Sequence, residues 1–281
     1  MTGAMDELRR RAYLRAMGID LWMPLAVALP PAATQGPAPA IPAPMPPPPG
    51  TETAWEEVSA PILEVVAPTS VPVPAVPETS PRPTQPPAIP LFEDPATLDW
   101  DALATAVAAC RACGLGATRT QTVFGVGNRQ ARLLVIGEAP GADEDREGEP
   151  FVGRAGQLLN QMLAAIGLER GQVYIANILK CRPPGNRNPL PVEVEHCQGY
   201  LARQVALIRP RVILSVGAIS AQTLLGTDTP VGRLRGRWFD YGPAAIPLRV
   251  TYHPAYLLRS PEQKGKAWED LIEVARRLGA D

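Results

Sequence analysis

Four cysteines are the residues of this chain whose types and spacing point most directly to chemistry. Cys110 and Cys113 form a C-x-x-C pair, and Cys181 and Cys197 follow after gaps of 67 and 15 residues. In a large enzyme-like domain this pattern favours metal or cluster ligation over disulfides. Four thiolates suit Zn²⁺ and a [4Fe–4S] cluster equally, and His196 is not expected to be a fifth ligand. The spacing leaves open the cluster, structural zinc, and four unligated buried cysteines.

An acidic segment, GEAPGADED, follows an apolar run and carries Glu138, Asp143 and Glu144. It contains neither a G-x-G-x-x-G nor a P-loop pattern, so nothing supports a cradle for nucleotide phosphates. Alone, the segment is equally well a solvated turn. Phe151 comes at its end, either as a core residue or as a platform for a flat ligand.

Two further polar residues stand in unusual places. Asn177 interrupts the apolar run VYIANIL, where an amide is costly unless it is paired. Its side chain therefore either reads an amide-like edge of a ligand or makes a structural hydrogen bond. His253 follows another apolar run, directly before Pro254, and is either a structural histidine or a catalytic one.

Strand and helix patterns alternate around these residues. Buried strands are predicted at 132–137, 173–179, 211–216 and 248–252, and helices at 96–109, 156–166, 191–208, 218–225 and 262–278. Strands that alternate with helices imply βαβ units and a parallel sheet covered on both faces. The expected fold is a three-layer αβα arrangement with a four-stranded, mainly parallel central sheet.

The unusual residues fall in loops that follow three of these strands, at 138–150, 180–188 and 253–259. Because ligands bind outside the carboxyl ends of the strands in such sheets, the three loops are expected to form one site. Basic residues in or near loops suggest contacts to a nucleic-acid backbone, with a solvated surface as the alternative. They are Lys180, Arg182, Arg187, Arg233, Arg235, Arg237 and Arg259.

Proline divides the chain unevenly. Of 34 prolines, 22 lie between residues 24 and 95, where they remove backbone donors and block helices. This excludes two folded domains of equal size. It predicts a short helical or peptide segment at 1–23, a disordered Pro/Ala-rich linker at 24–95 and one globular domain at 96–281.

Charge follows the same division. The chain has 27 basic and 28 acidic groups, of which residues 1–95 carry five and ten. Residues 96–281 therefore carry 22 basic and 18 acidic groups, a net charge of +4. A mildly basic domain is compatible with a polyanionic partner. Residues 21–33 imitate a secretory signal, but Arg15 and Asp20 cut the apolar run short on its N-terminal side and three prolines interrupt it. With no apolar run long enough to span a membrane, the expected location is the cytoplasm.

Four long stretches together carry a family resemblance. GEAPGADED (137–145), PFVGRAGQLL (150–159), YIANILKCRPPGNRNPLP (174–191) and HPAYLLR (253–259) closely resemble family 4 uracil-DNA glycosylases, the iron–sulfur members of that superfamily. The resemblance covers about residues 104–279 and does not extend to residues 1–95. It implies an enzyme of base excision repair that flips uracil out of DNA, hydrolyses the N-glycosidic bond and leaves an abasic site.

The resemblance also implies roles in uracil binding. Phe151 would stack on the flipped base, and Asn177 would hydrogen-bond its polar edge. Glu138 and Ala139 would form the floor of the pocket. His253 would face the uracil oxygen that becomes anionic as the bond breaks, and would stabilise that charge.

Further roles concern the cofactor and the DNA. The resemblance implies a [4Fe–4S] cluster, in preference to zinc, on Cys110, Cys113, Cys181 and Cys197. Leu257, four residues after His253, matches the wedge leucine of the wider superfamily. Arg259 and Arg187 are the expected contacts to the DNA backbone.

The residue that activates water is left open. In the best-known branch of the superfamily an Asp positions the water, but Ala139 stands in that place here. Glu144 is the first candidate for a general base and Asp143 the second, and a mechanism in which bond cleavage precedes water attack needs little base help. The loop CRPPGNRNPLP lacks the histidine of the branch that attaches covalently to DNA, so turnover is expected. The alternative function is a non-catalytic DNA-binding module of a repair or replication complex.

Residues 19–22 (IDLW) have the apolar–Asp–Leu–aromatic pattern of peptides that dock in bacterial sliding clamps. A tether of 72 residues, 24–95, would let the catalytic domain search nearby DNA while this peptide stays bound. The alternative is a tail that packs on its own protein or binds nothing. A monomer is the expected state.

Overall fold

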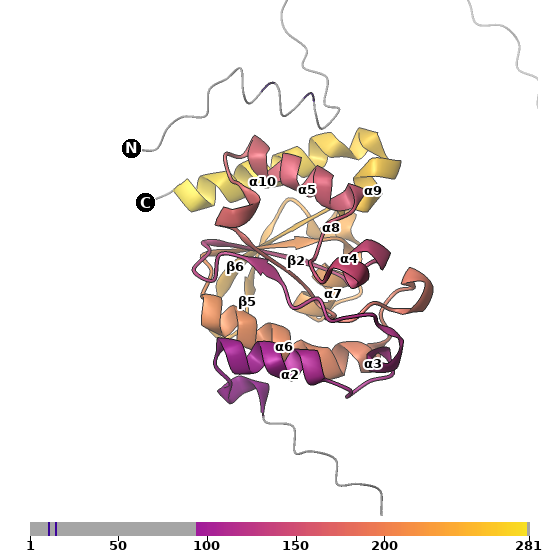
Figure 1. Ribbon diagram of the computed structural model, residues 1–281. Helices are drawn as coiled ribbons and strands as arrows, with labels where there is room; N and C mark the ends of the chain where they lie inside the picture. Colours follow the sequence, from indigo (N-terminus) through magenta and orange to yellow (C-terminus); the bar gives the residue numbers. More distant parts are fainter. Residues whose placement is uncertain (1–10, 12–14, 16–93, 280–281) are drawn as a thin grey trace, which may run out of the picture. The chain divides into compact units, whose positions relative to one another are not determined.

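The computed structural model of the chain describes residues 94–279, together with Arg11 and Arg15. Nearly all of the predicted segments at 1–23 and 24–95 lies outside the described residues, and so does the clamp-like motif at 19–22. In residues 94–279, helices cover both faces of a central sheet (Figure 1). No helix of this part combines the length and the apolar character needed to cross a membrane.

The sheet has six strands in the order β1-β3-β2-β4-β6-β5. Its four inner strands are parallel, as predicted: β3 (Tyr174–Asn177), β2 (Leu133–Gly137), β4 (Val212–Val216) and β6 (Ile246–Thr251). The predicted number of four strands was too low. Two edge strands, β1 (Val126–Gly127) and β5 (Trp238–Tyr241), pair antiparallel with β3 and β6. Both are short and only partly buried, so they lack the apolar run that marks an inner strand.

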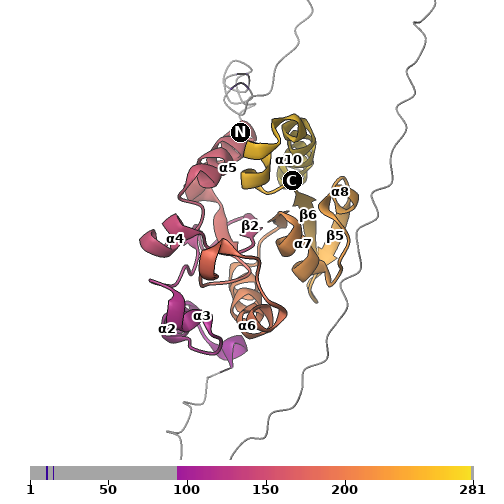
Figure 2. The same cartoon turned by 90° about the vertical axis from the view of Figure 1, so that its right-hand side faces the viewer.

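Burial on both faces explains why the inner strands are apolar throughout. Successive side chains point to opposite faces, so Leu133 and Val135 pack with α5 (Arg154–Ala165) and α10 (Lys264–Gly279). Leu134 and Ile136 pack on the other face, with α6 (Pro191–Ile208), α7 (Ala218–Leu225) and α8 (Val231–Leu234). Figure 2, turned by a quarter, shows α5 and α10 on one side of the sheet and α6 on the other.

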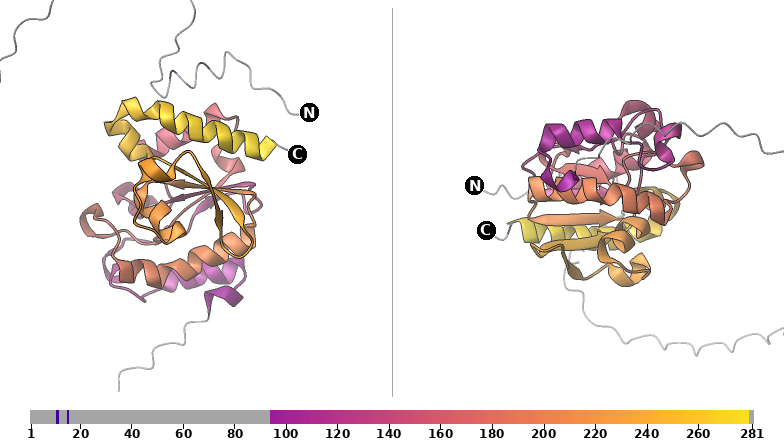
Figure 3. Two further views of the ribbon diagram at one scale, coloured as in Figure 1. Left: turned by 180° about the vertical axis from the view of Figure 1, so that it is seen from behind. Right: turned by 90° about the horizontal axis from the view of Figure 1, so that it is seen from below.

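The first helix of the domain packs outside α6. It is α2 (Trp100–Ala109), which starts later than predicted because the Asp99 side chain caps it by accepting the Ala102 N–H at 2.9 Å. Residues Pro95–Thr97 form a separate 3₁₀ turn, η1. Figure 3 shows α2 lying beside α6. Cys110 follows α2 directly, and Cys113 comes just before α3 (Leu115–Thr118).

Short helices occupy two of the segments that were predicted as loops. They are α4 (Ala142–Glu147), after β2, and α9 (Pro254–Arg259), after β6. Proline at the first position of α9 has the backbone angle that a helix start requires. Three further 3₁₀ turns complete the domain: η2 (Arg170–Gln172), η3 (Pro184–Asn186) and η4 (Pro261–Gln263).

Candidate active site

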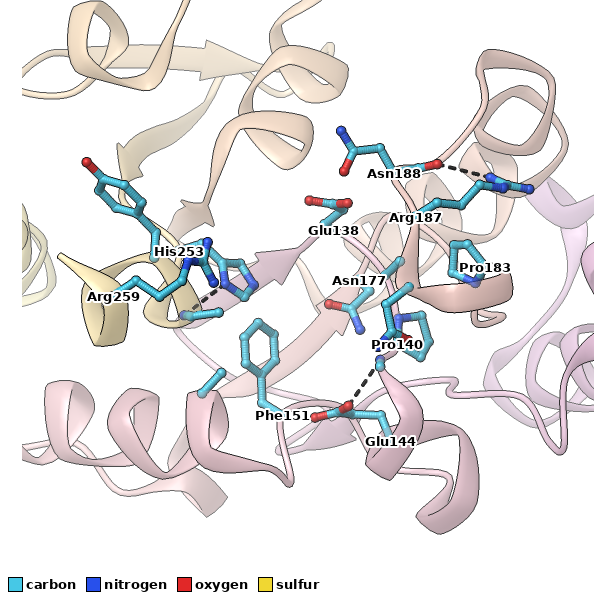
Figure 4. A pocket seen from close by; sticks show the side chains of 16 residues that line it. Glu138, Pro140, Glu144, Phe151, Asn177, Pro183, Arg187, Asn188, His253 and Arg259 are labelled. Atoms are coloured by element: carbon cyan, nitrogen blue, oxygen red, sulfur yellow. Dashed lines mark hydrogen bonds between the residues drawn. The ribbon is translucent and has the colours of Figure 1, made fainter.

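A pocket of about 480 Å³ opens at the carboxyl ends of the inner strands, where the three loops were expected to meet (Figure 4). The segment from β2 to α4, the loop after β3 and the start of α9 form its walls. The predicted site residues that line it are Glu138, Ala139, Glu144, Phe151, Asn177, Arg187, His253 and Arg259.

His253 is the N-cap residue of α9. Its Nδ1 accepts the backbone N–H of Ala255 at 3.1 Å, so the proton of the neutral ring is on Nε2. Burial, and secondarily the charge of Arg259, lower the pKa of His253 to about 4. The imidazole is therefore neutral near pH 7, with one N–H donor that the helix start leaves free.

Phe151 lies against His253, with ring centroids 5.5 Å apart and ring planes 29° from parallel. Its backbone φ is +56°, a value that bulky residues rarely adopt and that surrounding contacts must hold. Arg170 supplies such contacts, because its guanidinium donates to the carbonyls of Pro150 and Phe151. Arg170 is not among the predicted site residues, because it is 19 residues away from Phe151 and outside every motif.

Asn177 ends β3 beside Gly137, its partner on β2. The Asn177 Oδ1 is buried and has no hydrogen-bond partner in the described part of the chain. A Cβ on residue 137 would lie 2.4 Å from this oxygen and 2.6 Å from the Phe151 ring. Glycine at 137 is thus required by the close approach of the two side chains, and an unpaired buried acceptor faces the pocket that they line.

Glu144 and Glu138 both line the pocket, but only one of them has free oxygens. Glu144 Oε2 accepts the N–H of Gly141 at 3.0 Å, and Oε1 accepts those of Val152 and Gly153 at 3.1 and 3.3 Å. Glu144 therefore fastens the two ends of the segment that carries Phe151. The Glu138 carboxylate has no hydrogen bond to any described residue, and burial raises the pKa of this carboxyl.

Asp143, the second candidate for a general base, does not line the pocket. It is exposed and forms an ion pair with Arg146 at 2.9 Å. Of the three acidic residues considered, Glu138 is the one that faces the pocket with unbonded oxygens. The sequence analysis had placed it in the floor only.

The basic residues near the pocket differ in their availability. Arg187 is held by both oxygens of Glu193, at 2.9 and 2.6 Å, so a phosphate would have to share its guanidinium. Arg259 lines the pocket beside His253 and makes no ion pair within residues 94–279. Lys180 is 1% exposed, so the prediction that it contacts a nucleic-acid backbone was wrong.

Leu257 is not placed where a wedge would act. It is 1% exposed and packs in the core between α5 and α10, so it cannot enter DNA without unfolding α9. The next residue, Leu258, is 36% exposed, and so is Tyr256, which lines the pocket. In the run Tyr256-Leu257-Leu258 the packing of α9, not the spacing from His253, decides which side chain reaches the surface.

The four cysteines come together from three segments and line one small cavity beside α6: Cys110, Cys113, Cys181 and Cys197. Arg119 Nη1 donates to Cys181 Sγ at 2.9 Å, and the backbone N–H of Lys180 donates to Cys197 Sγ at 3.3 Å. Among residues 94–279, no group of three or more His, Cys, Asp or Glu side chains is arranged to hold a metal ion. His196 also borders the cavity, but its Nδ1 donates to the Val192 carbonyl at 2.6 Å.

Comparison with known proteins places this fold and pocket in a family. A model described as the uracil DNA glycosylase superfamily matches residues 124–272, a span that includes the pocket and two of the four cysteines. The matched span begins at Phe124, two residues before β1, and ends inside α10.

Individual relatives of the chain are uracil-DNA glycosylases as well. A type-4 uracil-DNA glycosylase of Archaeoglobus fulgidus is 43% identical over 185 residues, which are 64% of this chain and 93% of that protein. One of Thermotoga maritima is 44% identical over 154 residues, 54% of this chain and 79% of that protein. A type-5 uracil-DNA glycosylase of Pyrobaculum aerophilum is 30% identical over 177 residues, 55% of this chain and 74% of that protein. The chain therefore belongs to the uracil-DNA glycosylase superfamily, and within it to the type-4 family.

Proposed function

We propose that this chain binds uracil that has been flipped out of DNA and hydrolyses its N-glycosidic bond, leaving an abasic site. The observation that carries the proposal is the unpaired, buried Asn177 Oδ1 beside the Phe151 ring. A flat base that stacks on Phe151 and offers an N–H to Asn177 satisfies both groups. Names of the relatives, which are uracil-DNA glycosylases, support the same conclusion.

Asn177 selects uracil by the pattern of donors and acceptors on the base. Uracil presents an N3–H donor beside the O4 acceptor, which match the oxygen and the NH₂ of an asparagine amide. Cytosine presents the reverse pattern, an N3 acceptor beside an N4 donor, so two like groups would face each other. Because the pocket is inside the protein, the base must leave the stack, at a cost of a few kcal/mol that these contacts offset.

His253 stabilises the leaving group. When the bond between C1′ and N1 breaks, both electrons pass to the base, and the negative charge spreads onto O2. The neutral ring donates from Nε2 to that oxygen, while Nδ1 is held by the Ala255 N–H. A donor fixed in place before the reaction costs no reorganisation when the charge develops.

Glu138 is the candidate that orients the attacking water. The water oxygen bonds to C1′ and gives up a proton, and the uracil anion gains one, so the products are uracil and an abasic deoxyribose. Glu138 has free oxygens at the pocket and a raised pKa, which suits a group that accepts a proton. Glu144 instead positions Phe151 through its three backbone hydrogen bonds.

The surface around the pocket mouth supplies the groups for DNA. Arg259 has a charge without a carboxylate partner among the described residues, and it lies at the end of α9 beside the pocket. Tyr256 and Leu258 of the same helix are exposed apolar side chains. They replace Leu257 as candidates to fill the gap that the flipped base leaves.

A [4Fe–4S] cluster fits the four-cysteine cavity. All four thiols line one small space, and an N–H donor already points at two of the sulfurs. Each thiolate binds a different iron of such a cluster, so the sulfurs need not converge on a single ion. The cluster would hold residues 110–113 against α6 and the loop after β3, a structural role next to the pocket.

The catalytic unit is residues 96–281, and residues 1–95 extend it. The match to the Archaeoglobus fulgidus relative covers 64% of this chain but 93% of that protein, which supports this division. The sliding-clamp contact through residues 19–22, the monomeric state and the cytoplasmic location remain predictions.

A uracil-release assay tests the proposal directly. Single- and double-stranded oligonucleotides with one uracil, and a duplex with a thymine mismatch, are incubated with the full chain. Free uracil and an alkali-labile site are expected from the uracil substrates. A protein that retains its cluster absorbance and binds DNA but releases no uracil would overturn the proposal in favour of the DNA-binding module.

A further inference from the structure

Lys180 is a buried cation that has no carboxylate partner in the part of the chain that the structure describes. It is 1% exposed, and its Nζ donates to the backbone carbonyl of Asn177 at 3.0 Å and to Gln204 Oε1 at 2.6 Å. Both acceptors are neutral, and no ion pair to Lys180 is formed by any residue of the described domain. A buried charge is costly unless another charge compensates it. The nearby groups that would carry negative charge on binding iron are the thiols of Cys181 and Cys197.

Arg119 is a second cation on the same sulfur cavity. Its Nη1 donates to Cys181 Sγ at 2.9 Å, and Nη2 is anchored on the Ala108 carbonyl at 2.9 Å. A [4Fe–4S]²⁺ core with four thiolates has a net charge of −2. Lys180 and Arg119 together supply the opposite charge of +2 at this cavity.

We propose that Lys180 and Arg119 are the counter-charges that set the reduction potential of the iron–sulfur cluster. The proposal rests on the cluster assigned under the proposed function, but not on uracil release. Cluster potentials depend on net charge and on hydrogen bonds to the sulfurs, and these two residues contribute both. Lys180 is also a positioning residue for the pocket, because its ammonium holds the carbonyl of Asn177, whose side chain faces the base.

The test compares holoprotein variants by a redox titration followed by electron paramagnetic resonance. Lys180→Met and Arg119→Gln each remove one positive charge, and Lys180→Arg retains it. Lys266→Met is the matched control, because Lys266 is an exposed lysine of α10. Iron content and the visible absorbance of each protein are measured first, so that only loaded protein is titrated.

Loss of a nearby positive charge disfavours the added electron. Lys180→Met and Arg119→Gln are therefore each expected to shift the one-electron equilibrium at least about tenfold towards the oxidised cluster, which is about 59 mV more negative. Lys266→Met and Lys180→Arg should leave the potential unchanged. Fully loaded Lys180→Met and Arg119→Gln with the wild-type potential would overturn the proposal.

The iron content of the variants also tests the proposal when a variant fails to bind the cluster. If Lys180→Met loses the cluster and Lys180→Arg keeps it, the positive charge is what the cluster requires. If both lose it equally, Lys180 acts through its shape and the inference fails for that residue. Wild-type protein without iron would instead refute the cluster assignment, which keeps the two failures distinct.

Discussion

Replacing Asn177 by leucine separates what the folded protein needs from what the base needs. The two side chains have similar shapes, but leucine has no polar atoms. Asn177 Oδ1 is buried next to Gly137 and the Phe151 ring, and it has no partner among residues 94–279. Removing that oxygen therefore removes an unsatisfied acceptor, and it also removes both hydrogen bonds that the amide would make to uracil.

The two effects have opposite signs. An unsatisfied buried acceptor costs about 1–3 kcal/mol, so Asn177→Leu should raise the free energy of unfolding by about this amount. For a domain of this size the melting temperature rises by roughly 2–4 °C per kcal/mol. On the uracil side, two polar groups of the bound base would be left unpaired, at about 2–6 kcal/mol in total. That corresponds to a loss in kcat/KM of about 30-fold to about 10⁴-fold.

Two assays check these numbers on the same preparation. Urea unfolding followed by circular dichroism measures stability, and single-turnover uracil release measures the chemical step. Asn177→Asp is the comparison variant, because it keeps the shape but adds a buried charge and removes both N–H donors. It should lose uracil release and also lose stability.

A destabilised Asn177→Leu would show that Oδ1 has a partner in the free protein, for example ordered water, and the argument from an unsatisfied oxygen would fail. Uracil release that survives in Asn177→Leu would remove the amide from base recognition altogether. A gain in stability together with a loss of activity is the outcome that the geometry predicts.

Further substitutions test the remaining assignments. Glu144→Gln would present an N–H to backbone donors, so the free energy of unfolding of this variant should fall by about 1–3 kcal/mol. Glu138→Gln should keep the wild-type stability but lose more of the single-turnover rate than Glu144→Gln does. The reverse pattern would restore Glu144 as the base. His253, with a pKa of about 4, should itself add no change in rate between about pH 5.5 and 8; an inflection near pH 6.5 that persists in Glu138→Gln would refute a neutral buried ring. Because the unfolded imidazole takes up its proton near pH 6.5, the folded state should lose about 3 kcal/mol as pH falls from about 6.5 to 4, and urea titrations against His253→Gln measure that loss. Leu257→Ala should lower the free energy of unfolding by about 2–5 kcal/mol. Leu258→Ala should change stability little, but it should slow uracil release from double-stranded DNA more than from single-stranded DNA. Equal effects on both substrates would exclude a wedge role for Leu258.

The central sheet could be predicted because strands that are buried on both faces consist of apolar residues throughout. Each inner strand is an apolar run, and the polar residues that follow the runs did meet in one pocket. The edge strands β1 and β5 could not be predicted in this way. They hydrogen-bond on one side only and are partly exposed, so their residues carry no such run.

The differences between the predicted and the observed surroundings of site residues arise from partners that are distant in the sequence. Glu144 looked like a free acid, but Val152 and Gly153 donate to it from the far end of the segment. Lys180 looked like a loop cation, yet its ammonium donates a hydrogen bond to Gln204 inside the domain. Leu257 was chosen by its distance from His253, whereas the core against which α9 packs decides its exposure. Residue types can suggest chemistry, but hydrogen-bond partners and burial depend on tertiary packing.

The capping of α9 by His253 has a consequence for residue 255. The group that fixes the imidazole tautomer is a main-chain N–H, so the side chain of Ala255 has no part in it. Nineteen of the twenty amino acids provide that N–H, and only proline does not. Because Ala255 also lines the pocket, a mutational scan should find position 255 tolerant to other small residues and intolerant to proline. A position essential to the chemistry would thus show a limit on side-chain size only, apart from one missing residue.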